Sequence, residues 1–250
     1  MSHVTCHLLL SKMLMMLVFL VAMVYASVGH GGASGYLAAV SLLGYDPVHM
    51  ASSALVLNLF VAGLAFLAFR RAGHFSWSLT WPFLLASVPA AAVGGWLPVA
   101  GHAYHGLLAA VLLFAAARLW LRMPDRAGAD QEPRRRTALS IGAGIGLLSG
   151  VVGVGGGIFL SPLLVLRRWA DAKRTAATSA VFIVLNSLAG VAGRVMAGRF
   201  ETGSMLPLIV AASVGGAVGS RLGATCVPNP WLCRILGVVL GVAAVKLMVT

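Results

Sequence analysis

Two glycine-rich clusters are the residues of this sequence whose type and spacing best suit chemistry. The first reads VGHGGA at 28–33 and the second VGVGGG at 152–157, and each interrupts an apolar helical run. About 25 to 30 residues later, each half places one asparagine in another apolar run, Asn58 or Asn186. A helix that restarts after such a break presents unpaired N–H groups and the positive end of its dipole. Such a helix end can bind an anion without a buried cation.

The elements that must position these clusters are membrane-spanning helices. Of the 250 residues, 60% are hydrophobic and only 10% are charged, and the mean hydropathy is +0.95. A spanning helix needs roughly 20 mostly apolar residues and satisfies its own backbone hydrogen bonds. Uninterrupted apolar spans are predicted near 50–69, 78–98, 103–121, 175–197, 204–224 and 231–249. Regions 8–44 and 138–167 contain the glycine clusters, and their short pieces favour a helix that breaks partway or a re-entrant hairpin.

The distribution of lysine and arginine predicts two inverted repeats. If each interrupted region returns to the face it entered and three full spans follow, one face receives 14 of the 18 basic residues. Short cytoplasmic loops collect Lys and Arg, so that face is expected to be cytoplasmic. A plain eight-span topology would instead place the run from Arg167 to Arg174 outside. The predicted organisation is therefore a first membrane repeat at 1–121, a cytoplasmic linker at 122–137 and a second membrane repeat at 138–250.

Repeated residues extend this internal symmetry beyond the glycine clusters. The motif GHF at 73–75 matches GRF at 198–200, an offset of 125. Three further pairs lie 125 or 128 positions apart, namely Pro82 and Pro207, Gly94 and Gly219, and Asn58 and Asn186. Paired helix breaks in the two halves of a repeat are the sequence feature that best indicates the binding site of a transporter.

The second cluster and the residues after it resemble the signature of a known family. The run GVVGVGGG at 150–157 is followed by PLL at 162–164, ATS at 177–179 and NS at 186–187. This pattern is similar to that of the sulfite exporter TauE/SafE family, and the first half, with Gly31, Gly32 and Asn58, resembles a degenerate copy. The resemblance covers nearly the whole chain. It implies movement of small sulfur-containing anions, such as sulfite or organosulfonates, across the bacterial inner membrane, mostly outward.

The candidate substrate-binding residues lie in the two breaks or on the spans that follow them. They are Gly29, His30, Gly31, Gly32, Asn58, Gly153, Gly155, Gly156, Gly157, Thr178, Ser179, Asn186 and Arg194. The glycines permit left-handed backbone and close approach of an oxyanion, although small residues also serve helix packing in membranes.

Each polar candidate has a second interpretation. The two asparagines either complete the coordination of an anion or cap backbone freed at the adjacent break. The hydroxyls of Thr178 and Ser179 either donate to an anion or cap a helix start. His30, which stands where the family more usually has a glycine, could bind an anion, carry a proton or only hydrogen-bond nearby backbone. Arg194, about two turns after Asn186, either attracts an anion or extends to the end of its span.

The positions of the charged residues indicate which driving force the expected transport can use. All six acidic residues fall at predicted loops or span ends, so the spans offer no carboxylate to relay protons or sodium. A membrane potential that is negative inside favours anion efflux by about 2.3 kcal/mol per charge per 100 mV. A potential-driven uniporter is physically sufficient.

Other classes of function fit the sequence less well. The net charge of +12 reflects topology rather than nucleic-acid binding. The sequence has no phosphate-loop pattern, and its glycine runs lack the setting of a dinucleotide site, so neither an enzyme nor a cofactor or metal is expected.

The prediction is an all-α polytopic bundle of the inner membrane that exports a small sulfur oxyanion. Its expected partners are that anion and the lipid bilayer, and a homodimer is left open. Import of a sulfur anion or another small solute, and a non-transporting accessory subunit, remain the alternatives.

Overall fold

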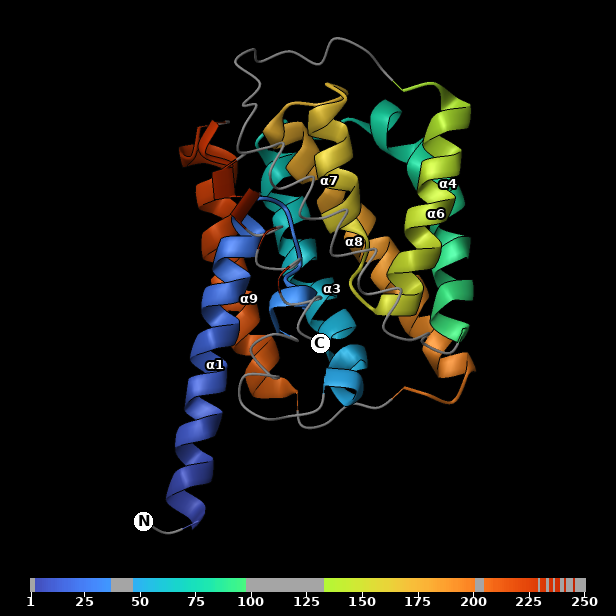
Figure 1. Cartoon of the computed structure of the whole chain (residues 1–250). Helices are drawn as coiled ribbons and strands as arrows, with labels where there is room; N and C mark the ends of the chain where they lie inside the picture. The colour runs from blue at the N-terminus through green and yellow to red at the C-terminus, as the bar shows by residue number, and fades with distance from the viewer. Residues whose placement is uncertain are drawn as a thin grey trace.

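The computed structural model describes residues 3–36, 47–97, 133–200 and 205–228, together with scattered residues between 230 and 245. Within these ranges the chain is helical and has no strand (Figure 1). The helices are α1 (His3–Ser27), α3 (Pro47–Arg71), α4 (Trp77–Trp96), α6 (Arg135–Val152), α7 (Gly157–Leu166), α8 (Ala172–Met196) and α9 (Leu206–Arg221), and a short π-helical turn, η1 (Leu222–Cys226), follows α9. The predicted all-α class is confirmed.

Four of the described segments are long and apolar enough to cross a membrane. They are Ser52–Arg71, Trp77–Trp96, Ala172–Met196 and Leu206–Cys226. They coincide with four of the predicted spans, those near 50–69, 78–98, 175–197 and 204–224. The span expected at 103–121 and most of the one at 231–249 lie outside the described residues.

The ends of the helices follow from local sequence. Helix α8 begins after Asp171, whose carboxylate accepts a hydrogen bond from the Arg174 amide at 2.8 Å, which is the usual role of an N-cap. Helices α3 and α8 end alike, because Gly73 and Gly198 take φ angles of 80° and 66°. The left-handed glycine lets the amide of the next residue turn back to the last helical turn, as helix C-caps commonly do. The repeated motifs at 73–75 and 198–200 therefore produce the same helix end.

Glycines hold two pairs of helices side by side in parallel. Three glycines of α6 rest on the α4 backbone, with Gly142 on Phe83, Gly146 on Ser87 and Gly150 on Ala91. Glycines of α9 and η1 rest on α1 in the same way, with Gly215 on Phe19, Gly219 on Met23 and Gly223 on Ser27. In each pair the residue numbers rise together, so the two helices run in the same direction. A side chain at these positions would collide with backbone, which explains why small residues are needed for such close packing.

The remaining contacts set the direction of α3 and α8. Helix α8 runs parallel to α4, since Thr178 meets Thr80 and Asn186 meets Ser87. Helix α3 runs parallel to α9, since Gly216 lies against Val61 and the Ala224 carbonyl accepts a hydrogen bond from His74 Nε2, just past the end of α3. Contacts between α3 and α8 run the opposite way: Phe69 packs on Ala176 and Leu55 lies near Gly190. The helices thus fall into two sets of opposite direction, α1, α3 and α9 against α4, α6 and α8 (Figure 1).

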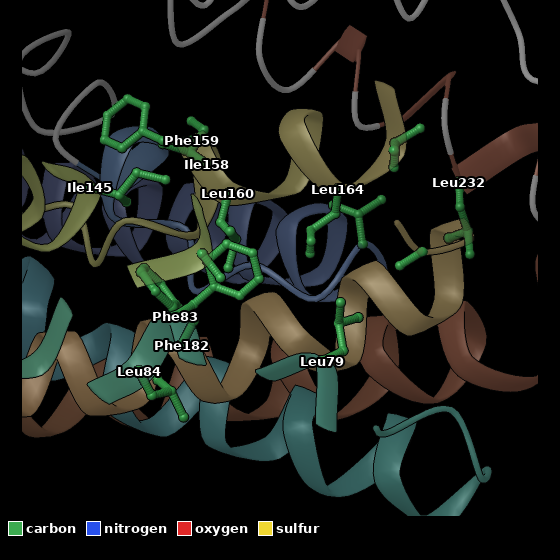
Figure 2. Packing of buried hydrophobic residues seen from close by; sticks show 14 residues of the cluster. Leu79, Phe83, Leu84, Ile145, Ile158, Phe159, Leu160, Leu164, Phe182 and Leu232 are labelled. Carbon is green, nitrogen blue, oxygen red and sulfur yellow. The ribbon is translucent and has the colours of Figure 1, made fainter. Parts of the chain in front are cut away.

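Helix α7 turns back along α8 after the second glycine cluster. The Ser161 and Ser179 hydroxyls are 2.7 Å apart, and Gly157 lies against Ile183, so α7 and α8 are antiparallel. Beyond α7, the Trp169 ring returns to within 6.2 Å of the Phe83 ring. Apolar side chains of α4, α6, α7 and α8 fill the space between these helices, as Figure 2 shows. Helices α6 and α7 therefore form a helical hairpin with the glycines at its tip.

Candidate functional site

The second break is built by three left-handed glycines. Gly153 ends α6 with a φ of 78° and donates its amide to the Ser149 carbonyl at 2.8 Å. Gly155 and Gly156 follow with φ angles of 77° and 78°, and α7 begins directly after Gly156. An L residue in left-handed backbone costs roughly 1–2 kcal/mol. The glycines are therefore required by the backbone of the break.

The first break repeats two of these three left-handed glycines at equivalent positions. Gly29 and Gly32 have φ angles of 78° and 94°, and they stand 124 residues before Gly153 and Gly156. A helical turn resumes at Ala33. Gly31 packs directly against the Asn58 side chain. The repeated sequence thus encodes a partly repeated backbone path, since Gly31, which stands 124 residues before Gly155, is not left-handed.

Asn58 joins the two breaks. Its side chain is fully buried on α3, and Oδ1 accepts a hydrogen bond from the Ala33 amide at 3.1 Å. Its Nδ2 donates to the Val154 carbonyl, at 3.3 Å, in the second break. Both contacts are caps of backbone freed at a break, and they reach both halves of the chain.

Asn186 occupies the equivalent position in the second half but bonds differently. Its Nδ2 donates to the Phe182 carbonyl at 2.8 Å and to the Ser87 hydroxyl at 3.1 Å. The side chain is fully buried, and its Oδ1 has no hydrogen-bond partner. Because Nδ2 faces a carbonyl oxygen, the amide cannot be reversed, and the free atom is the acceptor.

The His30 ring links the first break to α7 and α8. Nδ1 lies 3.1 Å from the Val28 carbonyl and Nε2 lies 3.2 Å from the Ser161 hydroxyl. A carbonyl only accepts, so Nδ1 carries the proton in the neutral ring and Nε2 accepts from Ser161. Ser179 then donates to Ser161 across 2.7 Å. The imidazole is buried and, in this arrangement, both ring nitrogens are occupied by protein groups.

Comparison with known proteins identifies the family. A sequence model described as "Sulfite exporter TauE/SafE" matches residues 14–247. The chain belongs to the TauE/SafE family. A relative from Sinorhizobium fredii (strain NBRC 101917 / NGR234), named "Probable membrane transporter protein y4hK", is 35% identical over 235 residues, which are 92% of this chain and 95% of the relative. No solved structure matches. The chain is thus a membrane transporter of the TauE/SafE family.

Two further candidates on α8 of this TauE/SafE protein contact neighbouring helices. Thr178 lies 3.2 Å from the Thr80 hydroxyl, which itself donates to the Ser76 carbonyl at 2.7 Å, so Thr178 donates to Thr80 and joins α8 to α4. Arg194 is 8% exposed and donates from Nη2 to the Val151 carbonyl, at 3.4 Å, in the last turn of α6. A cation there stabilises the negative end of the α6 dipole. The guanidinium therefore sits beside the second break.

Three buried hydroxyls near the breaks were not predicted from the sequence. Ser187 Oγ lies 2.8 Å from the point that a Cβ on Gly155 would occupy, and the Ser149 side chain lies 3.1 Å from the same point on Gly156. The Tyr36 hydroxyl lies 2.8 Å from that point on Gly32. All three oxygens are buried without a hydrogen-bond partner. The one sequence signal for any of these hydroxyls is the motif NS, in which Ser187 follows Asn186.

The described residues hold no group of three His, Cys, Asp or Glu side chains that could bind a metal ion. The polar groups at the breaks are amides, hydroxyls, the His30 imidazole and the Arg194 guanidinium, which can bind an anion through hydrogen bonds.

Proposed function

We propose that this chain is a secondary transporter that exports a small sulfur-containing oxyanion, sulfite or an organosulfonate, across the bacterial inner membrane. The observation that carries the proposal is the meeting of the two helix breaks at Asn58, which contacts Ala33 of the first and Val154 of the second. Asn58 and Ala33 are buried inside the helical bundle, and Val154 is partly buried. A binding point shared by two broken helices is a recurring arrangement in transporters.

The start of α7 supports the binding of an anion. Its N-cap residue is Gly156, which has no side chain to accept hydrogen bonds from the first turn. The amides of Gly157 and Ile158 therefore lack the partner that a serine or aspartate cap would provide. The helix dipole adds about half a positive charge at this end. These groups can bind an oxyanion without the cost of burying a full cation.

The direction of the helices supports an inverted repeat. The equivalent pairs are α1 with α6, α3 with α8, and α4 with α9, and the members of each pair belong to opposite sets. The contact of Gly94 with Leu147 has a counterpart in the contact of Gly219 with Met23. Gly219 stands 125 residues after Gly94, and Met23 stands 124 residues before Leu147. A two-fold axis in the membrane plane would produce both relationships. We therefore assign the halves to 1–121 and 138–250, joined by a cytoplasmic linker at 122–137, and infer that they alternate access to the junction.

The acidic residues support transport driven by the membrane potential. In the described ranges Asp171 is the sole acid, and it caps the start of α8. The described helices thus contain no carboxylate to relay protons or sodium. An anion moves outward down the electrical gradient, which provides about 2.3 kcal/mol per charge per 100 mV.

Transport of radiolabelled sulfite into inside-out proteoliposomes tests the proposal. We expect saturable uptake that follows an imposed potential, and we would test sulfate, a sulfonate and chloride as competitors. Gly155→Ala should abolish it, because the φ of 77° is unfavourable for alanine and the new Cβ would lie 2.8–2.9 Å from Ser187 Oγ and Asn58 Nδ2. Gly144→Ala is the matched control, since a Cβ at this position of α6 meets open space.

Each alternative has its own outcome in this assay. Movement only from the periplasmic side would indicate an importer. Full transport by Gly155→Ala would indicate that the junction is not the site. A folded wild-type protein that moves no sulfur anion would overturn the substrate assignment and favour another solute or an accessory subunit.

A further inference from the structure

We propose that the two breaks are not equivalent: the anion is held at the second break alone, by the first-turn amides of α7 and the hydroxyls of Ser149 and Ser187. We further propose that this site selects a monoanion that itself carries a hydrogen-bond donor. The inference rests on the proposed function for the identity of the anion, but the location of the site can be tested with any small anion.

The first break is closed by the protein itself. The amide of Ala33, at the start of the resumed helix, is capped by Asn58 Oδ1 at 3.1 Å. The Asn58 side chain covers Gly31, and the Tyr36 ring covers Gly32. His30 has both ring nitrogens occupied, by Val28 and Ser161. An anion at the first break would have to displace these contacts.

The second break lacks the equivalent cap. Gly157 stands 124 residues after Ala33, and Asn186 stands 128 residues after Asn58. The corresponding bond, from the Gly157 amide to Asn186 Oδ1, is not made, and Oδ1 is buried without a partner. The side-chain acceptor that caps the resumed helix in the first half is thus unpartnered in the second, and no side chain caps the start of α7 from its N-cap position.

Two unpartnered hydroxyls complete the donor set. Ser187 Oγ is directed at Gly155 and the Ser149 side chain is adjacent to Gly156. Both serines are 0% exposed, and both oxygens lack a hydrogen-bond partner. Buried polar atoms are nearly always hydrogen-bonded in folded proteins, so this concentration of free atoms around one helix start indicates a ligand. Because every member is buried, the ligand enters only after the bundle opens.

The chemistry of these groups defines the anion. The groups that contact the positions of Gly155 and Gly156 are hydroxyl, amide and apolar side chains, which offer dipoles rather than full charges. The cation beside the break, Arg194, already donates to the Val151 carbonyl and supplies a single positive charge. The cost of burying an ion rises with the square of its charge, so a monoanion is favoured over a dianion. Asn186 Oδ1 can only accept a hydrogen bond, so a ligand with one O–H or N–H group satisfies it. Hydrogen sulfite fits this description, whereas sulfate and methanesulfonate do not.

Binding of radiolabelled sulfite to the purified protein in nanodiscs, at a pH where hydrogen sulfite predominates, tests the site. Ser149→Ala and Ser187→Ala should each weaken binding about 10- to 100-fold, the usual effect of losing a hydrogen bond to a charged group. Neither substitution should lower the thermal stability of the empty protein, because each removes a hydroxyl that has no partner. Methanesulfonate and sulfate should compete much more weakly than unlabelled sulfite.

Two control variants remove unpartnered buried hydroxyls elsewhere. Thr175→Val acts on α8, about 18 Å along the helix from Ser187, and Tyr36→Phe acts at the first break; Thr175 and Tyr36 oxygens are both buried without partners. Both variants should bind sulfite like the wild type.

The outcomes separate this inference from the proposed function. Weaker binding by Tyr36→Phe with normal binding by the two serine variants would place the anion at the first break and overturn the inference. Normal binding by all four variants, with loss in Gly155→Ala, would keep the junction as the site but exclude the hydroxyls. If sulfite does not bind but another monoanion binds through Ser149 and Ser187, the site stands and the sulfur substrate fails.

Discussion

The asymmetry of the two asparagines can be measured by making the same substitution at both. Asn58→Leu removes an amide of similar volume and leaves the buried Ala33 N–H and the part-buried Val154 carbonyl without these partners. An unsatisfied buried polar group costs about 1–3 kcal/mol, so the expected loss of stability is about 1–3 kcal/mol from the Ala33 N–H, with a smaller addition from the Val154 carbonyl.

Asn186→Leu should cost much less. The Phe182 carbonyl is four residues upstream and keeps its helical hydrogen bond. Only the Ser87 hydroxyl loses a hydrogen bond, the one that it accepts from Asn186 Nδ2. The unpartnered Asn186 Oδ1 is removed at the same time, which offsets part of the loss. We expect a net change within about 1 kcal/mol.

Unfolding by a denaturing detergent in mixed micelles, followed by tryptophan fluorescence, gives both free energies under the same conditions. Asn58→Leu should unfold at a clearly lower detergent fraction than Asn186→Leu. Equal destabilisation by the two variants, or a larger effect at Asn186, would refute the argument that the first break is capped and the second is open.

Three further predictions concern elements that hold the site in place, and the same unfolding assay measures each. Asp171→Ala should destabilise the protein by about 0.5–2 kcal/mol through loss of the α8 N-cap, whereas Asp171→Asn should retain most of the stability. Gly94→Ala and Gly219→Ala should each cost about 1–3 kcal/mol or more, because each new Cβ meets helix backbone; a large effect in only one would contradict their equivalence. Arg194→Gln should cost up to about 2 kcal/mol of stability by removing a cation from the α6 C-terminus. Arg194→Lys keeps the charge and should retain part of that stability. Equal stability of the two variants would show that the contact with Val151 depends on shape and not on charge.

Several features of the fold follow directly from the sequence. Long apolar runs predict spanning helices because the bilayer leaves few alternatives for the backbone, and four predicted spans coincide with described helices. The positions of both breaks were also predictable, since left-handed backbone at Gly29 and Gly153 depends mainly on the absence of a side chain. The inverted arrangement of the halves is a prediction that the basic residues and the directions of the helices both support.

The roles of individual polar residues were not predictable in the same way. Asn58 and Asn186 occupy equivalent places in a repeat, so sequence alone assigns them equivalent roles. Their different partners depend on side chains from other helices, such as Ser87 on α4 for Asn186. His30 likewise stood as a candidate for anion or proton binding until Ser161 and Val28 were seen beside its ring.

The sequence by itself determined that this is a helical membrane protein of the TauE/SafE family, with two glycine breaks, because apolar length, charge placement and glycine conformation are local properties. The tertiary structure decided that Asn58 reaches from one half to cap both breaks, and that Ser149 and Ser187 lie unpartnered beside the second. Those relationships arise where helices distant in sequence pack together. Hydrogen bonding acts over about 3 Å, so only the packed arrangement determines which polar atoms are satisfied and which remain available to a ligand.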